Sequence, residues 1–297
     1  MKILITGSKG FIGHNLADIL ANGNDVISTG RGPSLSAGPK NYFSWDLAEE
    51  SVPWEQIPHD LDVIVHVAAS LSPNNMDEGL IATNCLGSHR IYQLAKTRNV
   101  KRVFYISSVP VIGIPRSLPI TEEHPLRPRT MYHVTKLAGE MILDQLLYDG
   151  IEVVHLRIPS PIGPGMPVKT ILPIFIKNAL NGEKINIIGK GGRRQNYLDV
   201  RDLANLLCGC LDKEGIAGVY NIAAPETVSN LELAELCIKL TGSMSEIGFL
   251  DKEDEAEGQV WDVDTSKAAD KLGFRQQYTI QQSIADIANE MRRQKIV

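Results

Sequence analysis

The chain of 297 residues has few of the side chains on which disulfide-bonded and metal-binding proteins depend. Its four cysteines include no Cys-x-x-Cys pair, and its seven histidines show no zinc-binding spacing. Cys208 and Cys210 fall within an apolar helical pattern, so we expect them to be small buried side chains. The sequence therefore predicts a protein without a metal site or disulfides, in a reducing compartment such as the cytoplasm.

Long apolar runs and an excess of positive charge are also missing. No stretch approaches the ~18 apolar residues that a membrane span requires, and Gly7 and Lys9 interrupt an apolar start too short for a signal peptide. The formal charge is −5 and the isoelectric point about 5.8, which argues against a nucleic-acid or membrane partner. The composition is that of an ordinary globular protein, and we expect a small-molecule partner.

What the sequence does contain is a regular alternation of short apolar runs and amphipathic stretches. Five runs have the length and composition of buried strands, at residues 2–6, 25–29, 62–67, 102–107 and 153–157. Helical patterns at 11–21, 77–97 and 132–149 lie between them. Strand–helix–strand repetition implies right-handed crossovers, so residues 1–157 are predicted to form an α/β Rossmann domain with a doubly wound parallel sheet.

The character of the chain changes after Arg157. Residues 158–168 hold four prolines and two glycines, a density that predicts a loop without regular structure. Beyond this loop the sequence indicates short helices and strands, ending in a long helix near 279–295. We expect residues 158–297 to form mainly a smaller lobe that binds the substrate.

A glycine loop directly follows the first predicted strand and precedes the first predicted helix. In Gly7-Ser8-Lys9-Gly10-Phe11-Ile12-Gly13, the first glycine permits a tight turn and the second lets the backbone approach a pyrophosphate. The third allows the helix to pack closely on the strand. The helix N-terminus then offers free N–H groups and partial positive charge to phosphates, so this loop predicts a dinucleotide site.

The end of the second strand bears on the type of dinucleotide. An NAD site usually places an acidic residue there for the ribose 2′-hydroxyl, but this chain has Gly30 followed by Arg31. Glycine leaves room for a 2′-phosphate, and arginine can pair with it. Lys9 could point to the same place. The pattern favours NADP over NAD.

Further motifs follow in a fixed order along the chain. They are Asp46-Leu47, His66-Val67-Ala68-Ala69, Asn84-x-x-Gly87, Ile106-Ser107-Ser108 with Gly113, Tyr132-x-x-x-Lys136, Leu156-Arg157 with Gly163-Pro164-Gly165, Tyr197 to Asp202, and Asp264-x-Ser266-Lys267 with Leu272-Gly273-Phe274. With them the chain resembles the extended short-chain dehydrogenase/reductase family, in its branch of NAD(P)-dependent epimerases and dehydratases that act on nucleotide sugars. The resemblance covers nearly the whole chain.

The resemblance implies a set of cofactor contacts. They are Gly7, Gly10, Phe11, Ile12, Gly13, Arg31, Asp46, Leu47, Val67, Ala68, Ala69, Asn84, Tyr132 and Lys136. For Asn84 we expect a structural role or one at the cofactor's edge, and for His66 a packing role at the end of a strand.

The resemblance also implies how the chain is organised. It implies a return to the large lobe near residues 196–222. It further implies a homodimer through the helices at 77–97 and 132–149, where exposed apolar residues such as Ile91, Met141 and Leu147 could supply the contact.

Tyr132 and Lys136 are four residues apart in a helical pattern, so they share a face. Free tyrosine titrates near 10, too high for a general base at neutral pH. A lysine ammonium at ~4–5 Å, with an effective dielectric constant of ~20, stabilises the phenolate by roughly 3–4 kcal/mol. We therefore expect Lys136 to lower the pKa of Tyr132, which could then remove a hydroxyl proton as hydride leaves the substrate.

The third catalytic candidate is Ser108, just past the fifth strand, where the carboxyl ends of parallel strands form the ligand-binding edge. Its hydroxyl can hydrogen-bond a substrate oxygen as the charge on that oxygen changes. Ser107 is the competing candidate, but the family register favours Ser108 and leaves Ser107 a supporting or cofactor-contacting role.

Neighbouring residues narrow the reaction within the family. Where related dehydratases carry an Asp-Glu pair, this chain has Val109 and Pro110, which cannot transfer protons. The cysteine that 3,5-epimerase/reductases place at position 109 is missing too. For substrate binding, the resemblance points to Ser108 and Tyr132 with Ser160, where an asparagine is usual, and Gln195, where an arginine is usual and which Arg193 and Arg194 precede.

Three functions remain in competition. The first is a nucleotide-sugar epimerase that inverts C4 through a keto intermediate by reversible hydride transfer. The second is an NADP-dependent keto-sugar or carbonyl reductase, which needs the same residues and fits Gly30 and Arg31. The third is a non-catalytic NAD(P)-sensing regulator, which the presence of Tyr132 and Lys136 disfavours.

Overall fold

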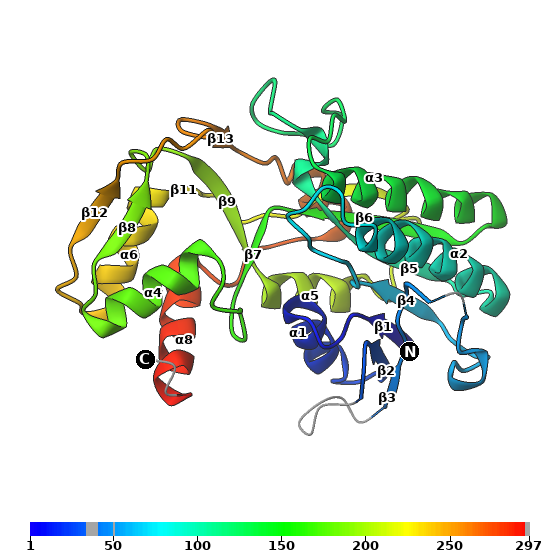
Figure 1. Cartoon of the computed structure of the whole chain (residues 1–297). Helices are drawn as coiled ribbons and strands as arrows, with labels where there is room; N and C mark the ends of the chain where they lie inside the picture. Colours follow the sequence, from blue (N-terminus) through cyan, green and yellow to red (C-terminus); the bar gives the residue numbers. More distant parts are fainter. Residues whose placement is uncertain (34–40, 50, 295–297) are drawn as a thin grey trace.

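The computed structural model describes residues 1–33, 41–49 and 51–294, which form two lobes (Figure 1). A seven-stranded, all-parallel sheet lies at the centre of the larger lobe. In spatial order its strands are β10 (Gly218–Asn221), β6 (Glu152–Ile158), β5 (Arg102–Ser108), β4 (Val63–His66), β1 (Lys2–Thr6), β2 (Asp25–Gly30) and β3 (Tyr42–Ser44). This order reverses direction between β1 and β4, which confirms the Rossmann fold predicted from the sequence.

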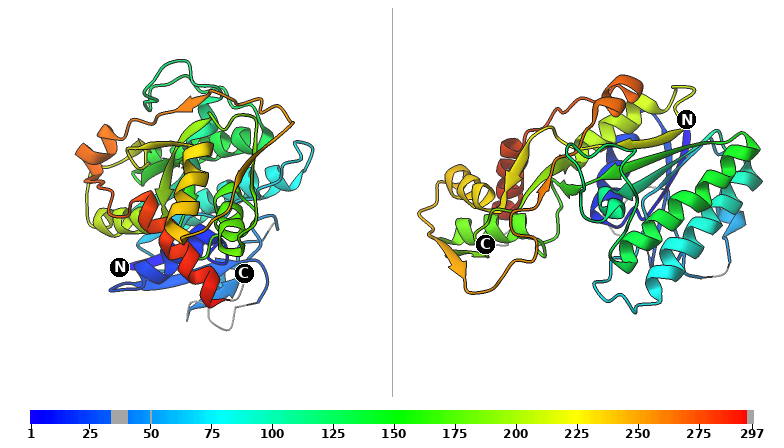
Figure 2. Two further views of the ribbon diagram at one scale, coloured as in Figure 1. Left: turned by 90° about the vertical axis from the view of Figure 1, so that its left-hand side faces the viewer. Right: turned by 90° about the horizontal axis from the view of Figure 1, so that it is seen from above.

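Both faces of this sheet are buried, which explains why its strands are continuously apolar. Successive residues of a strand enter opposite cores: Ile3 and Ile5 pack with α1 (Phe11–Leu20) and α5 (Val200–Cys210), whereas Leu4 packs on the other side. That second core lies under α2 (Gly87–Arg98) and α3 (Met131–Leu143). The two helical layers are visible in Figure 2.

The connections depart from plain α-helix in several places. The stretch expected as one helix at 77–97 starts as a π-helical segment, η2 (Ile81–Leu86), before α2. The pattern at 132–149 continues from α3 into a 3-10 turn, η4 (Asp144–Asp149), and short 3-10 turns also form η1 (Trp54–Gln56) and η3 (Val109–Ile112). Apolar periodicity does not distinguish these tighter or wider turns from α-helix.

The smaller lobe is built from short strands and three longer helices (Figure 1). One small sheet contains β7 (Ser160–Ile162), β9 (Arg194–Asp199), β11 (Thr227–Ser229) and β13 (Val260–Trp261), and β8 (Ile185–Ile188) pairs with β12 (Ile247–Leu250). A separate apolar core joins them to α4 (Ile171–Asn181), α6 (Asn230–Thr241) and α8 (Ile280–Arg293). The terminal helix expected near 279–295 is therefore present to Arg293, and residue 295 lies outside the described residues.

The proline-rich segment after Arg157 contains a strand that the sequence did not predict. β7 pairs in parallel with β9, with Ser160 opposite Tyr197 and Pro161 opposite Leu198. Among the described residues β7 has no second neighbour, and an edge strand tolerates a proline because one side of it needs no ladder hydrogen bonds. Proline density alone therefore misjudged this segment.

The chain returns to the larger lobe in its second half. α5 packs against α1, and β10 extends the large sheet beside β6, within the range expected from the resemblance. A later helix, α7 (Ser266–Leu272), contributes Ala268 and Leu272 to the same core and was not anticipated. The larger lobe is thus assembled from both halves of the sequence.

The exposure of individual side chains corrects the expectations for Ile91 and Cys208. Ile91 lies on the buried face of α2 and is fully buried, so of the apolar residues expected at a dimer contact only Met141 and Leu147 are exposed, at 63% and 44%. All four cysteines are free; Cys210 and Cys237 are buried, but Cys208 faces solvent because it lies on the outer side of α5, and Cys85 is half-buried.

In the described part of the chain no helix is long and apolar enough to cross a bilayer, and no cluster of three or more potential metal ligands occurs.

Candidate active site

The glycine loop forms a narrow cradle between β1 and α1. Gly7 has a φ of +71°, and a side chain there would lie 2.7 Å from the Cα of Ala68. At Gly13 a Cβ would lie 2.2 Å from the carbonyl oxygen of Gly7, so α1 packs directly on the loop rather than only on the strand. Gly10 is the N-cap residue of α1 and has no side chain that could bond the first N–H groups of the helix. These N–H groups therefore remain available to a ligand.

The end of β2 holds the residues that the sequence singled out for cofactor choice. Gly30 ends the strand, Arg31 is exposed, and both line the main cleft of the molecule. The Lys9 ammonium donates hydrogen bonds to the carbonyl oxygens of Arg31 and Pro33, at 2.9 and 2.8 Å. It thus adds a second positive charge beside Gly30, but its side chain folds over the loop after β2.

A cleft of about 740 Å³ runs along the carboxyl ends of the large sheet and is closed on one side by the smaller lobe. It is of the size that ligand sites occupy. The cleft brings together every site residue predicted from the sequence except one: Gly7, Gly10, Phe11, Ile12, Gly13, Arg31, Asp46, Leu47, Val67, Ala68, Ala69, Ser108, Tyr132, Lys136, Ser160 and Gln195.

The exception is Asn84, which is buried behind the cleft wall. Its side chain hydrogen-bonds both backbone groups of Ser70, at 2.7 and 3.1 Å, and the hydroxyl of Thr135 at 2.9 Å. It thereby fastens the loop after β4 to η2 and α3, so its observed contacts are those of the structural role.

His66 ends β4 and is completely buried. Its Nδ1 lies 2.8 Å from the Thr6 hydroxyl, and its ring lies beside Tyr105 with centroids 5.3 Å apart. Burial, with a smaller contribution from the Lys136 charge, lowers the pKa of His66 to about 3. A neutral ring held between strands has the packing role that the sequence indicated.

The two serines at the end of β5 have different surroundings. Ser107 donates a 2.5 Å hydrogen bond to Glu140 of α3, which commits its hydroxyl to the interior. The Ser108 hydroxyl has no hydrogen-bond partner among the described residues, and Ser108 lines the cleft. Ser108 is therefore the serine available to a substrate, and Ser107 is a supporting one.

Tyr132 and Lys136 lie one turn apart in α3 and both line the cleft, but their electrostatics differ from the expectation. Burial raises the pKa of Tyr132 to about 12. Burial also lowers the pKa of Lys136 to about 7, against an opposing attraction from Glu140. The Lys136 Nζ lies 4.0 Å over the ring of Tyr105. The net shift of the Tyr132 pKa is therefore upward, not the lowering expected from Lys136, because loss of water disfavours the charged form of each group.

The smaller lobe supplies the opposite wall of the cleft. Ser160 and Tyr197 are paired across β7 and β9, and Gln195 donates a 3.0 Å hydrogen bond to the Tyr197 hydroxyl. Arg193 immediately precedes β9, and burial raises the pKa of Tyr197 against a smaller lowering effect of the Arg193 charge. The Arg193 Nε is buried without a hydrogen-bond partner in the described structure, whereas Arg194 pairs with Glu232.

Several residues of the cleft were not found from the sequence. Thr6, at the end of β1, accepts hydrogen bonds from the backbone N–H groups of Val67 and Ala68 and so positions that wall. Thr29 and Trp45 line the cleft with a buried hydroxyl and indole N–H that have no partner among the described residues. Position at a strand end was the available signal for Thr6 and Thr29, and adjacency to Asp46 for Trp45.

These unpartnered groups and the glycine cradle test whether a dinucleotide fits the chain. Buried donors and acceptors normally find partners, so Thr29 and Trp45 provide polar atoms for a bound molecule. Gly7 and Gly13 leave a backbone surface that any side chain would fill. The residues present therefore fit a dinucleotide along β1, β2 and the loop after β4.

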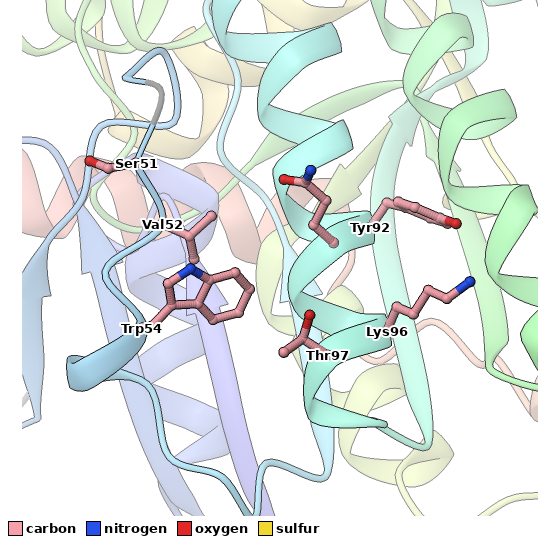
Figure 3. Close-up of a pocket in the computed structure, with 7 residues that line it drawn as sticks. Ser51, Val52, Trp54, Tyr92, Lys96 and Thr97 are labelled. Carbon is pink, nitrogen blue, oxygen red and sulfur yellow. The ribbon is translucent and has the colours of Figure 1, made fainter.

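A second hollow, of about 540 Å³, lies on the outside of the larger lobe between residues 51–54 and α2. Figure 3 shows Trp54 and Val52 beside the helix that carries Tyr92, Lys96 and Thr97. The Lys96 ammonium is occupied by Asp149 at 2.8 Å. None of the site residues predicted from the sequence lines this hollow.

Comparison with known proteins agrees with this geometry. A model of the NAD dependent epimerase/dehydratase family matches residues 3–223. The chain belongs to this family. It is thus an epimerase/dehydratase-family enzyme, which confirms the family predicted from the sequence motifs.

Relatives within the epimerase/dehydratase family differ in activity. The chain is 30% identical over 273 residues to UDP-glucose 4-epimerase of Lactobacillus helveticus, covering 82% of each protein. It is also 30% identical over 293 residues to UDP-glucuronic acid decarboxylase 1 of Xenopus tropicalis, covering 92% of this chain and 68% of that one. The UDP-glucuronic acid 4-epimerase from Bacillus cereus, solved in complex with NAD, has the same fold, with a TM-score of 0.86, 23% identity and 99% coverage of both chains.

The close contact in the glycine cradle leads to a first prediction. Gly13→Ala should lower the melting temperature and abolish cofactor binding, because its Cβ would meet a backbone oxygen that cannot move without displacing the loop. Thermal unfolding and titration with NAD and NADP measure both effects. Gly209→Ala is the matched control, since it is also a helical glycine but has open space around it and should be neutral or stabilising by about 0.5–1 kcal/mol.

Burial of the Lys136 ammonium leads to a second prediction. Between its folded-state pKa of about 7 and the unfolded value of ~10.4, the unfolded chain binds more protons, so this residue lets stability rise with pH. Lys136→Met should therefore raise the melting temperature by several degrees at pH 6. The gain should shrink as the pH rises above ~7 and nearly vanish by about pH 11, above the unfolded-state pKa, where the wild-type lysine is largely neutral in both states.

Thermal unfolding of the Lys136→Met variant across this pH range provides the measurement. The exposed Lys252→Met is the control and should show no pH-dependent gain. Equal melting temperatures for wild type and Lys136→Met at every pH would contradict the burial cost.

Proposed function

We propose that this enzyme is an NAD(P)-dependent nucleotide-sugar 4-epimerase. The observation that carries the proposal is one cleft in which Ser108, Tyr132 and Lys136 line the carboxyl edge of the large sheet. The adjacent positions are the apolar Val109 and Pro110, which add no acid or base for elimination of water. The UDP-glucose 4-epimerase of Lactobacillus helveticus is a relative with which this reaction is consistent.

The cofactor is proposed to lie along the glycine loop and β2. Gly7, Gly10, Phe11, Ile12 and Gly13 would hold the pyrophosphate at the start of α1. Asp46, Leu47 and the wall formed by Val67, Ala68 and Ala69 would enclose the adenine and nicotinamide portions. When bound, the oxidised nicotinamide supplies the acceptor for a hydride.

The protein's own groups handle the proton and the substrate oxygen. Tyr132 Oη takes the proton of the sugar hydroxyl as that carbon becomes a ketone, and Ser108 hydrogen-bonds the same oxygen throughout. Because burial holds the pKa of Tyr132 at about 12, the phenolate needs positive charge nearby. Lys136 provides such a charge from the next turn of α3, and it is also proposed to hold the nicotinamide ribose.

Re-addition of hydride to the opposite face of the keto intermediate would complete the epimerisation. The reaction then has no net oxidation, and Tyr132 returns its proton to the oxygen. The smaller lobe must accommodate both orientations of the sugar.

An anionic substrate is supported by the wall of the smaller lobe. Ser160 and Gln195 offer a hydroxyl and an amide at the cleft, and Arg193, just before β9 and close enough for its charge to act on Tyr197, has a buried Nε without a partner among the described residues. A diphosphate would give these donors an acceptor of opposite charge. This arrangement supports a nucleotide sugar although the arginine usual at position 195 is missing.

A keto-sugar reductase is the second candidate, and the charges at the end of β2 favour it. Gly30, Arg31 and the Lys9 ammonium create a site that can accept the 2′-phosphate of NADP, a cofactor typical of reductive enzymes. Purified protein incubated with UDP-glucose, UDP-galactose, UDP-glucuronic acid and a UDP-4-keto-sugar, with and without NADPH, separates the two. Interconversion of sugars without net change in nicotinamide absorbance supports the epimerase, and stoichiometric NADPH oxidation with a keto-sugar supports the reductase.

Removal of the proposed base provides a third prediction. Tyr132→Phe keeps the ring but removes the phenol, so kcat should fall by roughly 10²–10⁴ with cofactor affinity largely retained. Tyr148→Phe, at a tyrosine that is 88% exposed, is the matched control and should leave kcat unchanged. Full activity of Tyr132→Phe would rule out this mechanism.

Cofactor choice provides a fourth prediction. NADP should bind more tightly than NAD, and Arg31→Ala should weaken NADP binding by roughly tenfold to a hundredfold while leaving NAD nearly unaffected, because only NADP carries the 2′-phosphate. Calorimetric titration of both nucleotides gives the comparison, with Arg293→Ala on the exposed end of α8 as control. Tighter binding of NAD by the wild type would overturn the NADP preference.

We also propose a homodimer through α2 and α3, which fewer exposed apolar residues support than the sequence suggested. Met141 and Leu147 present exposed apolar surface on α3 and η4, whereas Ile91 is buried and contributes to the monomer core. Sedimentation at micromolar concentration tests this association, and a monomer alone would refute it.

A further inference from the structure

A buried ion pair lies directly below the cleft, between α3 and β6. The Arg157 guanidinium donates two hydrogen bonds to Glu140, from Nε at 3.0 Å and from a terminal nitrogen at 2.6 Å. Both side chains are 4% exposed. Burying two charges costs hydration free energy even when they are paired, and an apolar pair could hold the same elements together. The ion pair therefore costs more free energy than packing alone would require.

Glu140 connects this pair to the floor of the cleft. Its Oε1 accepts, besides the Arg157 Nε, the 2.5 Å hydrogen bond from Ser107. Ser107 precedes Ser108 on β5, and both line the cleft. The carboxylate thus links three elements at the carboxyl edge of the sheet: α3, β5 and β6.

Glu140 also acts on Lys136, which lies one helical turn earlier on the same face of α3. The Lys136 ammonium is almost completely buried, with the Tyr105 ring on one side at 4.0 Å. The titratable groups that face it are Tyr132 and Glu140 from α3, Tyr105 from β5 and His66 from β4. Glu140 is the one among them that carries negative charge at neutral pH while it is paired with Arg157.

We propose that Glu140 is a positioning residue of the reaction, which keeps Lys136 charged and Ser107 fixed beneath the bound cofactor. This inference rests on the role proposed above for Lys136. Arg157 and Ser107 hold the carboxylate one helical turn from Lys136, where water is excluded, and its negative charge opposes the effect of burial on the ammonium. Removal of Glu140 would leave burial unopposed, and the lysine would become neutral at a lower pH.

The chain contains a matched control at the opposite end of the same strands. Arg102, the first residue of β5, donates a 2.9 Å hydrogen bond to Glu152 of β6. This second pair also joins Arg to Glu across β5 and β6, but it lies at the amino edge of the sheet, away from the cleft. Glu152→Gln therefore disrupts a comparable ion pair without approaching Lys136.

The experiment follows the ionisation of Lys136 by NMR of protein labelled at its lysine side chains, with Lys136→Met to assign the signal. Wild type, Glu140→Gln and Glu152→Gln are titrated between about pH 5 and 9 without cofactor or substrate. Glu140→Gln should move the Lys136 transition to lower pH, because the opposing negative charge is gone. Glu152→Gln should leave the transition where it is in the wild type.

A second measurement reads the consequence for cofactor binding. Affinity for NAD is measured by calorimetry at pH 6 and pH 8. At pH 8 it should be lower in Glu140→Gln than in the other two proteins by about tenfold for each unit that the transition moves, and the difference should be smaller at pH 6. Because the NMR readout needs no turnover, it still decides the role of Glu140 if the epimerase proposal fails.

A second variant covers the case in which the buried, unpaired Arg157 prevents Glu140→Gln from folding. The double variant Glu140→Gln/Arg157→Met removes both charges and should show a smaller downward movement of the Lys136 transition, because loss of the Arg157 positive charge partly offsets loss of the carboxylate. A Lys136 transition at the wild-type pH in whichever of these variants folds would overturn the proposal and leave Glu140 a purely structural residue.

Discussion

The ammonium group buried under the cleft is the feature around which the larger lobe is organised. Lys136 is about 2% exposed, and burial alone would make it neutral near physiological pH. The groups around it limit this effect in different ways: the Tyr105 ring offers its negative face, Glu140 offers a charge, and His66 stays neutral between Thr6 and Ser88. A site that titrates near neutrality can respond to the charge of whatever occupies the cleft.

Much of the fold could be predicted because the strands of a buried parallel sheet have a recognisable local sequence pattern. Strands buried on both faces must be continuously apolar, and the five predicted strands of the large sheet agree with β1, β2, β4, β5 and β6 to within one or two residues. The glycine loop was equally clear, since only glycine fits at positions 7 and 13. The catalytic candidates followed from their place in ordered motifs, and the structure brings them to one cleft.

The rest depended on contacts that are distant in the sequence. β7 exists because β9, more than thirty residues later, pairs with it, and nothing in a proline-rich segment reveals such a partner. The Tyr132 pKa was misjudged because spacing along a helix gives the distance to Lys136 but not the loss of water around both groups. Ile91 fits an exposed helical position by composition, yet the neighbouring helix and sheet bury it. Solvation and long-range pairing are properties of the assembled molecule.

The way α5, α7 and β10 return to the large sheet constrains how this architecture can be divided. One face of that sheet is covered by α1 together with two helices encoded after residue 199, so a fragment ending at 157 would expose Ile106, Leu156 and their neighbours to water. Such a fragment would behave as an aggregation-prone half rather than a portable nucleotide-binding module. The two lobes therefore cannot be separated by a single cut in the chain. New specificity in this architecture has to arise by changes in loops and short strands, not by exchange of whole lobes between genes.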